Sequence, residues 1–237
     1  MDAATTEQGA RERRRAEILK TIPGWYRPLV HLAIPSAIGV GVAATALAQL
    51  RGVTSTDLLA IPITLLVSFG FEWRAHKDVL HKSAPGLGLL YRRHELMHHV
   101  LYTYDDMAMR SPRELWLILM PAYAIGLVVL LVAPFAALVL YLAGTNAAML
   151  MLATAMAFFL SYEWLHAAYH LPAQSFIGRL SLIRTLRELH RRHHDPRLMK
   201  RYNFNVTVPV FDVVHGTLWS PDREAARSRP HGAAREA

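Results

Sequence analysis

The 237-residue sequence contains no cysteine. This absence excludes disulfide bonds, thiolate zinc sites, iron–sulfur clusters and thiol nucleophiles. Charge is also scarce, since Asp, Glu, Lys and Arg make up 19% of the residues against 53% hydrophobic residues, and the mean hydropathy is +0.19. Such a chain is too apolar for an ordinary soluble domain and for a disordered one. A metal site would have to be built from carboxylates and from the 13 histidines.

The longest stretch without a charged residue runs from Leu115 to Tyr162 and has 48 residues. As a helix it would be roughly 72 Å long, more than twice the ~30 Å thickness of a bilayer core. We therefore expect two membrane crossings joined by a turn, at either Pro134 or the Gly144-Thr145-Asn146 cluster. Two further spans are predicted upstream, over 29–50 and from Leu58 through Phe71 toward His76. The sequence thus predicts an all-α integral membrane protein with four transmembrane helices in two hairpins.

The basic residues are distributed unevenly between these spans. Of the 26 lysines and arginines, only Arg51 falls in a connection on the far side, and the other 25 lie in residues 1–28, 72–114 and 163–237. The positive-inside rule makes the side of those three segments cytoplasmic, with both termini there; for a bacterial protein the membrane would be the inner or plasma membrane. The net charge of +8 is then a membrane-facing property, and no nucleic acid partner is expected.

The chain is expected to have three parts. Residues 1–28 form a cytoplasmic segment, with an interfacial helix over 11–28 that holds Trp25 and Tyr26 at the level of the lipid headgroups. Residues 29–220 form the membrane domain, whose helical cap holds a dimetal site on the cytoplasmic side. Residues 221–237, rich in Ala, Arg and Pro, are expected to be disordered.

Two helix boundaries are predicted from local signals. Ser111 at a cap position, Pro112 at the first helical position and Glu114 three residues after the cap predict the start of the third span. Apolar residues at helical spacing among arginines predict an amphipathic helix over 177–189 on the cytoplasmic surface.

Ten histidines fall into four clusters with the spacing of metal ligands. They are His76 and His81; His94, His98 and His99; His166 and His170; and His190, His193 and His194. Positions three or four apart share a helix face, so each of the last three clusters can direct two or three imidazoles to one point. Ten nitrogen ligands exceed the need of one ion, and two metals are implied. Imidazole suits Fe, Zn, Cu and Ni alike, so the ligands do not name the metal.

The residues around these clusters include two glutamates at matching places in the two halves. Glu72 lies four residues before His76, and Glu163 lies three residues before His166, each next to a tryptophan. Either carboxylate is a candidate to accept a hydrogen bond from an imidazole and fix its tautomer, or to be an interfacial residue beside a tryptophan anchor. Three histidines outside the clusters are not expected to bind metal: His31, His215 and His231.

The ordered pattern HxxxxH, HxxxHH, HxxxH and HxxHH resembles the fatty acid hydroxylase/sterol desaturase superfamily of integral-membrane oxygenases, over about residues 70–218. The closing residues 203–205, Asp212 and Gly216-Thr217 are similar to the Asn-rich and Asp-xxx-Gly-Thr ending of that superfamily. His215 departs from it, because an aromatic or aliphatic residue often stands there.

This resemblance implies a dinuclear iron centre held by the ten clustered histidines, which zinc can occupy in a purified sample, with Asn205 and Asp212 as outer partners. It also implies O2 as the oxidant and hydroxylation or desaturation of an unactivated C–H bond in a lipid-like substrate. The chain has no evident flavin or nicotinamide motif, so electrons are expected from an external cytochrome or ferredoxin system.

Two other function classes stay open. His94-Glu95-Leu96-Met97-His98 matches the HExxH pattern of zinc proteases, with Glu95 as general base, but such a site leaves most of the clustered histidines without a role. A metal transporter would place polar ligands near the middle of the membrane, whereas the expected mid-span positions are apolar. Metal stoichiometry and oxygen consumption discriminate between the three classes.

Overall fold

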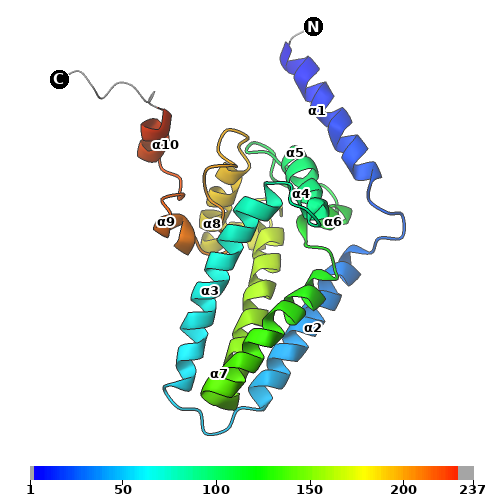
Figure 1. Cartoon of the computed structure of the whole chain (residues 1–237). Helices are drawn as coiled ribbons and strands as arrows, with labels where there is room; N and C mark the ends of the chain where they lie inside the picture. The colour runs from blue at the N-terminus through cyan, green and yellow to red at the C-terminus, as the bar shows by residue number, and fades with distance from the viewer. Residues whose placement is uncertain (1–2, 229–237) are drawn as a thin grey trace, which may run out of the picture.

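Every regular element in residues 3–228, the part of the chain that the computed structural model describes, is a helix. The long helices α2 (Pro28–Ala48), α3 (Ala60–Ala75) and α7 (Ala124–Tyr169) run side by side, with shorter helices gathered at one end (Figure 1). Three helical stretches are long and apolar enough to cross a membrane: Pro28–Ala48, Asp57–Leu80 and Ala124–Tyr169. The prediction of an all-helical membrane protein is confirmed at this level.

The stretch labelled α7 consists of two antiparallel arms. Gly144, with φ 85° and ψ 179°, interrupts the helix in a conformation that is essentially reserved for glycine. The chain doubles back there (Figure 1), and Ile125 of the first arm packs in one apolar cluster with Met156 of the second. Of the two predicted turn positions, the one at Gly144 is correct, and Pro134 lies inside the first arm.

The turns at the far end of the long helices meet each other. The backbone N–H of Arg51 donates to Oδ1 of Asn146 (3.1 Å), and Nδ2 of Asn146 donates to the carbonyl oxygen of Arg51 (2.8 Å). Higher in the bundle, Gly39 of α2 lets the second arm of α7 approach closely, because a Cβ there would lie 3.0 Å from Leu160 Cδ2. The first hairpin, α2 and α3, is thereby joined to α7 at its base.

The other end carries the short elements. They are α1 (Ala3–Lys20), the π-helical turn His76–Leu80, α4 (Gly88–Arg93), the π-helical turn His94–His98, α5 (His99–Leu101), the 3₁₀ turns Asp57–Leu59, Pro112–Glu114 and Ile177–Arg179, α6 (Leu115–Ile118), α8 (Ser181–His193), α9 (Val210–Val214) and α10 (Pro221–Ser228). Of these, only the turn Asp57–Leu59 lies at the far end of the bundle, where it leads into α3. The rest surround the histidine clusters.

The predicted start of the third span at Ser111 is wrong. The Ser111 hydroxyl does accept the N–H of Arg113 (3.3 Å), but it caps a single 3₁₀ turn that leads into α6. α6 ends at Ile118, before Pro121, whose ring disfavours helix in the residue before it. The apolar residues from 115 to 119 therefore pack in the cap, and the long helix begins at Ala124.

Three other boundaries also differ from the prediction. The N-terminal helix covers Ala3–Lys20, ahead of Pro23 and Gly24, and Tyr26 is buried against the cap. The helix expected over 177–189 breaks at Leu180 (ψ 133°) and restarts as α8. Pro221–Ser228 of the expected disordered tail are helical, and the rest of that tail, with His231, lies outside the described residues.

Candidate metal centre

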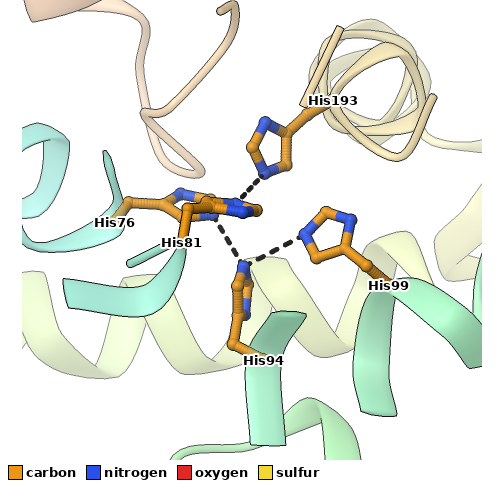
Figure 2. Close-up of side chains that lie close together, drawn as sticks. All are labelled: His76, His81, His94, His99 and His193. Atoms are coloured by element: carbon orange, nitrogen blue, oxygen red, sulfur yellow. Dashed lines mark hydrogen bonds between the residues drawn. The ribbon is translucent and has the colours of Figure 1, made fainter. Parts of the chain in front are cut away.

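All ten clustered histidines converge in the cap and form two groups. The first group has nitrogens within 4.8 Å of one another and consists of His76, His81, His94, His99 and His193 (Figure 2). By the same measure, the second group contains His98, His166, His170 and His190. We add His194 to the second group, because its Nε2 lies 3.2 Å from that of His98 and 3.1 Å from that of His190. No ring of the ten is more than 8% exposed.

The two π-helical turns explain how neighbouring histidines reach the same group. A π-helix hydrogen-bonds residue i to i+5, so it brings residues five apart onto one side. His76 and His81 stack at 5.1 Å between ring centroids, and His94 and His99, also five apart, meet at 4.7 Å. His94 and His98, four apart, do stack at 5.2 Å between ring centroids, as expected of residues on one face, but their nitrogens belong to different groups.

The last cluster is divided in the same way. His193 belongs to the first group, whereas His190 and His194, four apart on α8, meet in the second. Adjacent residues near the end of one helix thus serve both groups. The ring of His194 also stacks on that of His99 at 4.2 Å, which places the two groups in direct contact.

Five imidazoles are oriented through their Nδ1 atoms. Backbone carbonyl oxygens accept from four of them: Phe204 from His76 (2.5 Å), Met107 from His170 (2.8 Å), Tyr202 from His193 (3.0 Å) and Tyr102 from His194 (2.8 Å). The Glu95 carboxylate contacts Nδ1 of His81. Because these partners accept hydrogen bonds, each of the five Nδ1 atoms carries the proton and each Nε2 presents a lone pair.

In this tautomer assignment two ring nitrogens with lone pairs face each other, and a bound cation would remove the repulsion between them. Nε2 of His81 and Nε2 of His193 lie 2.9 Å apart, and in this tautomer both present lone pairs, which repel each other. Burial and the neighbouring His76 and His81 lower the pKa of His193 well below its usual value, which disfavours protonation of that ring. A metal ion bound to both nitrogens removes the repulsion, and the all-imidazole donor set fits such an ion.

Six further imidazoles are also kept in the neutral form. Burial, together with neighbouring imidazoles, lowers the pKa of those outside the long helices well below the usual value: His94, His98, His99, His170, His190 and His194. Neutral imidazole is the form that binds metal, so this environment favours metal ligation over protonation.

Glu72 and Glu163, candidates to accept from imidazoles or to be interfacial residues, bind amide groups instead. Glu72 accepts from the N–H groups of Val206 (2.6 Å) and Thr207 (2.9 Å) and from Nδ2 of Asn205 (3.0 Å). Glu163 accepts from the N–H of Met120 at 3.2 Å. A buried carboxylate at each of these positions fixes a loop that covers the site, and Glu95 has the role that was expected of them.

Asn205 and Asp212 act on the site through the same loop. Asp212 accepts from the N–H groups of Phe204 (3.0 Å) and Asn205 (2.8 Å), and Asn205 Oδ1 accepts from the N–H of Asp212 (3.2 Å). The loop held in this way carries the carbonyl groups of Tyr202 and Phe204 that orient His193 and His76. Asn205 and Asp212 therefore act on the imidazoles indirectly, by holding the loop whose carbonyl groups accept from His193 and His76.

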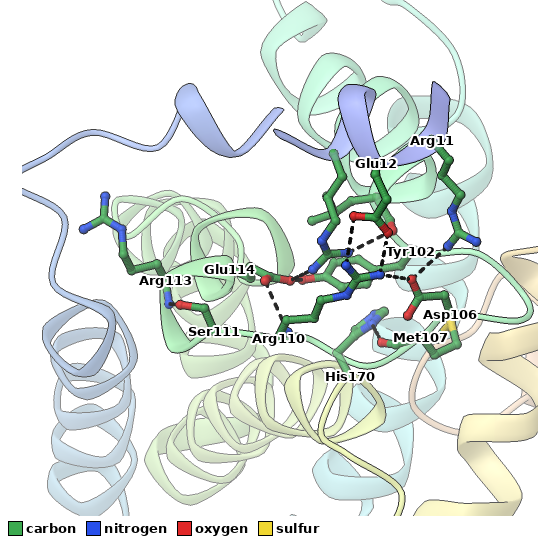
Figure 3. A network of polar contacts seen from close by, with 12 residues as sticks. Arg11, Glu12, Tyr102, Asp106, Met107, Arg110, Ser111, Arg113, Glu114 and His170 are labelled. Atoms are coloured by element: carbon green, nitrogen blue, oxygen red, sulfur yellow. Dashed lines mark hydrogen bonds and ion pairs between the residues drawn. The ribbon is translucent and has the colours of Figure 1, made fainter. Parts of the chain in front are cut away.

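The first 20 residues contribute a buried network that the sequence did not reveal. Arg15 pairs with Glu114 at 2.6 Å, and the hydroxyl of Tyr102 donates to the same carboxylate oxygen (2.9 Å). Beside it, Arg110 binds both carboxylate oxygens of Glu12 at 3.0 Å (Figure 3). In the sequence, Arg15 is one of several arginines in a polar segment, and no spacing distinguishes it from Arg13 or Arg14.

This network surrounds two of the carbonyl groups that orient the second group. Tyr102 accepts from His194, and Met107, next to the Asp106 that pairs with Arg110 (2.8 Å), accepts from His170 (Figure 3). α1 therefore packs directly over the supports of the second group.

A small cavity of about 20 Å³ contacts both groups. His94 of the first group and His166 of the second line it, and most of the other lining side chains are apolar: Leu80, Leu90, Leu117, Ile118, Leu119, Met120 and Pro121. Tyr162 and Arg93 also line it, and the Arg93 guanidinium donates to the carbonyl oxygen of Trp116.

His31 and His215, which lie outside the four clusters, have other partners. His31 lies between the Tyr26 hydroxyl (2.8 Å) and the carbonyl oxygen of Met120 (2.9 Å), and the ring of His215 stacks on Trp73 at 4.1 Å. Neither belongs to a histidine group.

Comparisons with known proteins agree with this geometry. The profile of the fatty acid hydroxylase family matches residues 61–217, a range that contains all ten clustered histidines. A solved structure of full-length scs7p, with only its hydroxylase domain visible, is similar with a TM-score of 0.54 and 23% sequence identity, and the match covers 81% of this chain and 67% of that chain. At this identity the likeness shows a shared fold. No match was found among the curated proteins. With most of its length matched by the family profile, the chain belongs to the fatty acid hydroxylase family.

Proposed function

We propose that the protein is a membrane-bound, O2-dependent lipid hydroxylase with one iron ion in each histidine group. The observation that carries this proposal is the convergence of five buried imidazoles in one group, with Nε2 of His81 and Nε2 of His193 2.9 Å apart. When bound, the iron would supply the activation of O2 and the attack on an unactivated C–H bond, which no side chain can supply.

The protein's own part is to orient and to exclude water. Acceptors at Nδ1 fix the direction of five imidazoles, so that Nε2 faces the metal position without reorganisation. The burial of all ten rings keeps bulk water from the site, which protects reactive species from side reactions.

We further propose four membrane crossings, formed by α2, α3 and the two arms of α7, with the cap and both termini on the cytoplasmic side. The reversal at Gly144 and its proximity to the α2–α3 turn support two hairpins. The location of 25 of the 26 basic residues outside the far-side turns supports the orientation.

The substrate proposed for this site is a membrane lipid chain. Most side chains that line the cavity beside His94 and His166 are apolar. Tyr162 in its wall belongs to α7, which we propose crosses the membrane, so an acyl or isoprenoid chain would arrive from the bilayer along this helix. Hydroxylation consumes the C–H compound, O2, two electrons and two protons, and forms the alcohol and one water. Desaturation is the nearest variant and leaves no oxygen in the lipid.

The protease interpretation is less well supported. Although burial acts to raise it, the pKa of Glu95 is lowered by hydrogen bonds from His81 and Lys200 (2.9 Å). This carboxylate is committed to orienting a ligand and is not free to take a proton from water. The transporter interpretation requires ligands near mid-membrane, whereas the histidine groups are built from cap elements and from the cap ends of α3 and α7.

Labelled oxygen tests the proposed function. The iron-loaded protein is incubated with ¹⁸O2, an external reductant and a lipid extract, and the lipids are analysed by mass spectrometry. One ¹⁸O atom in a lipid, lost in His98→Ala and kept in His231→Ala, supports hydroxylation. Loss of two hydrogens without label indicates desaturation. Peptide cleavage without oxygen, abolished by Glu95→Gln, would establish the protease instead.

A further inference from the structure

A second cavity lies beside the first histidine group and is open at the surface of the molecule. Its volume is about 260 Å³. Three basic side chains, Lys77, Lys200 and Arg201, line it together with the rings of Trp73, Phe204 and His215. Among the residues that the structure describes, no carboxylate lines this cavity. Lys200 is 60% exposed and pairs with Glu95 at 2.9 Å, so Lys77 and Arg201 supply most of the positive charge. The cavity is therefore a positively charged recess with an aromatic floor.

The aromatic floor connects the recess to the metal position. The exposed ring of His215 stacks on Trp73 at 4.1 Å, and Trp73 meets Phe204 at 6.0 Å between centroids. The Phe204 ring lies 5.8 Å from His193 and 6.2 Å from His76, both in the first group. Trp73 and Phe204 are 6% and 1% exposed, so these two rings form the layer between the recess and the ligands.

Hydrogen bonds make a second connection through the same residues. Nε1 of Trp73 donates to the Thr217 hydroxyl (3.0 Å), which donates to Asp212 (2.7 Å). Asp212 accepts from the N–H of Phe204 (3.0 Å), and the carbonyl oxygen of Phe204 accepts from Nδ1 of His76 (2.5 Å). Trp73 is thus coupled to a ligand both by ring contacts and by a continuous chain of short contacts.

The buried histidines make an indirect route for electrons necessary. All ten imidazoles are at most 8% exposed, so a carrier protein cannot touch the metals directly. The chain has no cysteine for an iron–sulfur cluster, and electrons for the reaction must come from outside. The substrate cavity is separate from the recess, since the two share no lining residue.

We propose that the recess is the docking site of an acidic one-electron carrier protein, and that electrons pass through Trp73 and Phe204 to the first group. In each transfer the carrier is oxidised by one electron and the metal pair is reduced by one, and two transfers serve one hydroxylation. This inference rests on the proposed function. Positive charge in the recess attracts the acidic face of the carrier and raises its association rate.

Binding to the metal-free protein tests the docking site without any turnover. The probes are two acidic carriers, a plant-type [2Fe–2S] ferredoxin and a cytochrome b5, titrated calorimetrically at low and high salt. The double variant Lys77→Glu/Arg201→Glu should weaken binding by about tenfold or more and flatten its salt dependence. Lys20→Glu, an exposed charge reversal on α1, is the matched control and should bind like the parent.

Two results would overturn the docking site. One is equal binding of both carriers to the parent and the double variant. The other is binding of inorganic phosphate in the recess while neither carrier distinguishes the parent from the variant, which would identify a small-anion site.

Reduction kinetics test the path. In the iron-loaded protein, Phe204→Leu removes the ring but keeps the carbonyl that holds His76, and it should slow reduction by a carrier by about tenfold or more while iron content is unchanged. Phe158→Leu, which removes a ring that packs on Phe69, is the control. Reduction of the variant by carrier at the control rate would exclude the path. Failure to bind iron, or to be reduced by dithionite, would instead count against the proposed function, and the binding test would still report on the recess.

Discussion

Arg15 and Glu114, which are 99 residues apart in the sequence, form a buried ion pair with 2.6 Å between Nη2 and Oε2. The same carboxylate oxygen accepts from the Tyr102 hydroxyl, and the carbonyl of Tyr102 orients His194. The pair thus joins α1, which lies before the range matched by the family profile, to a support of the second histidine group.

Removal of the arginine should be costly. Arg15→Ala leaves the Glu114 carboxylate buried without its counter-charge, and breaking a buried pair in this way typically costs about 3–5 kcal/mol. We expect a lower unfolding temperature in detergent and a reduced metal content. Lys20→Ala, which removes an exposed pair with Glu17, is the control and should change little. Equal stability of the two variants would contradict the proposed support.

Acid should destabilise the metal-free protein. Burial lowers the pKa of seven imidazoles outside the long helices, namely His94, His98, His99, His170, His190, His193 and His194. In the unfolded chain their pKa returns to about 6.5. Below that pH the unfolded state therefore binds more protons, and stability falls as pH decreases, by up to about 1.4 kcal/mol per pH unit for each residue.

The unfolding temperature measured across the range from about pH 8 to about pH 5 checks this sign. It should be nearly constant above neutrality and drop steeply below about pH 6.5. Bound metal competes with protons, so the metal-loaded protein should drop at lower pH. A flat profile, or greater stability in acid, would show that the imidazoles are not buried and neutral in the metal-free state.

Single cysteines test the membrane topology cleanly, because the native chain has none. The hydrogen bonds between Arg51 and Asn146 place the α2–α3 turn beside the reversal of α7. Ser55→Cys and Thr145→Cys should therefore both react with an impermeant reagent from the periplasmic or luminal side, and Ser83→Cys only from the cytoplasm. Labelling of Ser55 and Thr145 variants from opposite sides would contradict the two-hairpin arrangement.

The large features of the fold follow from signals that are local in the sequence. An uncharged run too long for one crossing, with a glycine near its middle, predicts a helical hairpin, and Gly144 makes the turn. Histidines at fixed spacing predict a convergent site, because helical periodicity alone brings such residues together. These inferences need no knowledge of which segments pack against each other.

The division of the histidines into two groups was not predictable in this way. It depends on π-helical turns at His76 and His94, which an α-helical period does not anticipate, and on the packing of α8 against both groups. The partners of Glu72 and Glu95 were not predictable for a similar reason, since each carboxylate's partner comes from another segment of the chain. Arg15 and Glu114 are 99 residues apart, and neither position has a periodic neighbour to mark it.

The apolar cavity makes a prediction about substrate size. Leu90 lines it together with His94 and His166, whereas the adjacent Leu89 does not line it and is 49% exposed. Leu90→Trp should fill the space in front of both groups and reduce oxidation of long-chain lipids by about tenfold or more, as expected when a pocket loses the volume its substrate occupies. The ligands themselves are untouched, so iron content should equal that of the parent.

Leu89→Trp is the matched control, because it adds the same side chain at an exposed position one residue away. If both variants lost activity equally, or if Leu90→Trp had no effect on long and short chains alike, the substrate would have to reach the histidines by another route, and this cavity would be only a packing gap between α4 and α6.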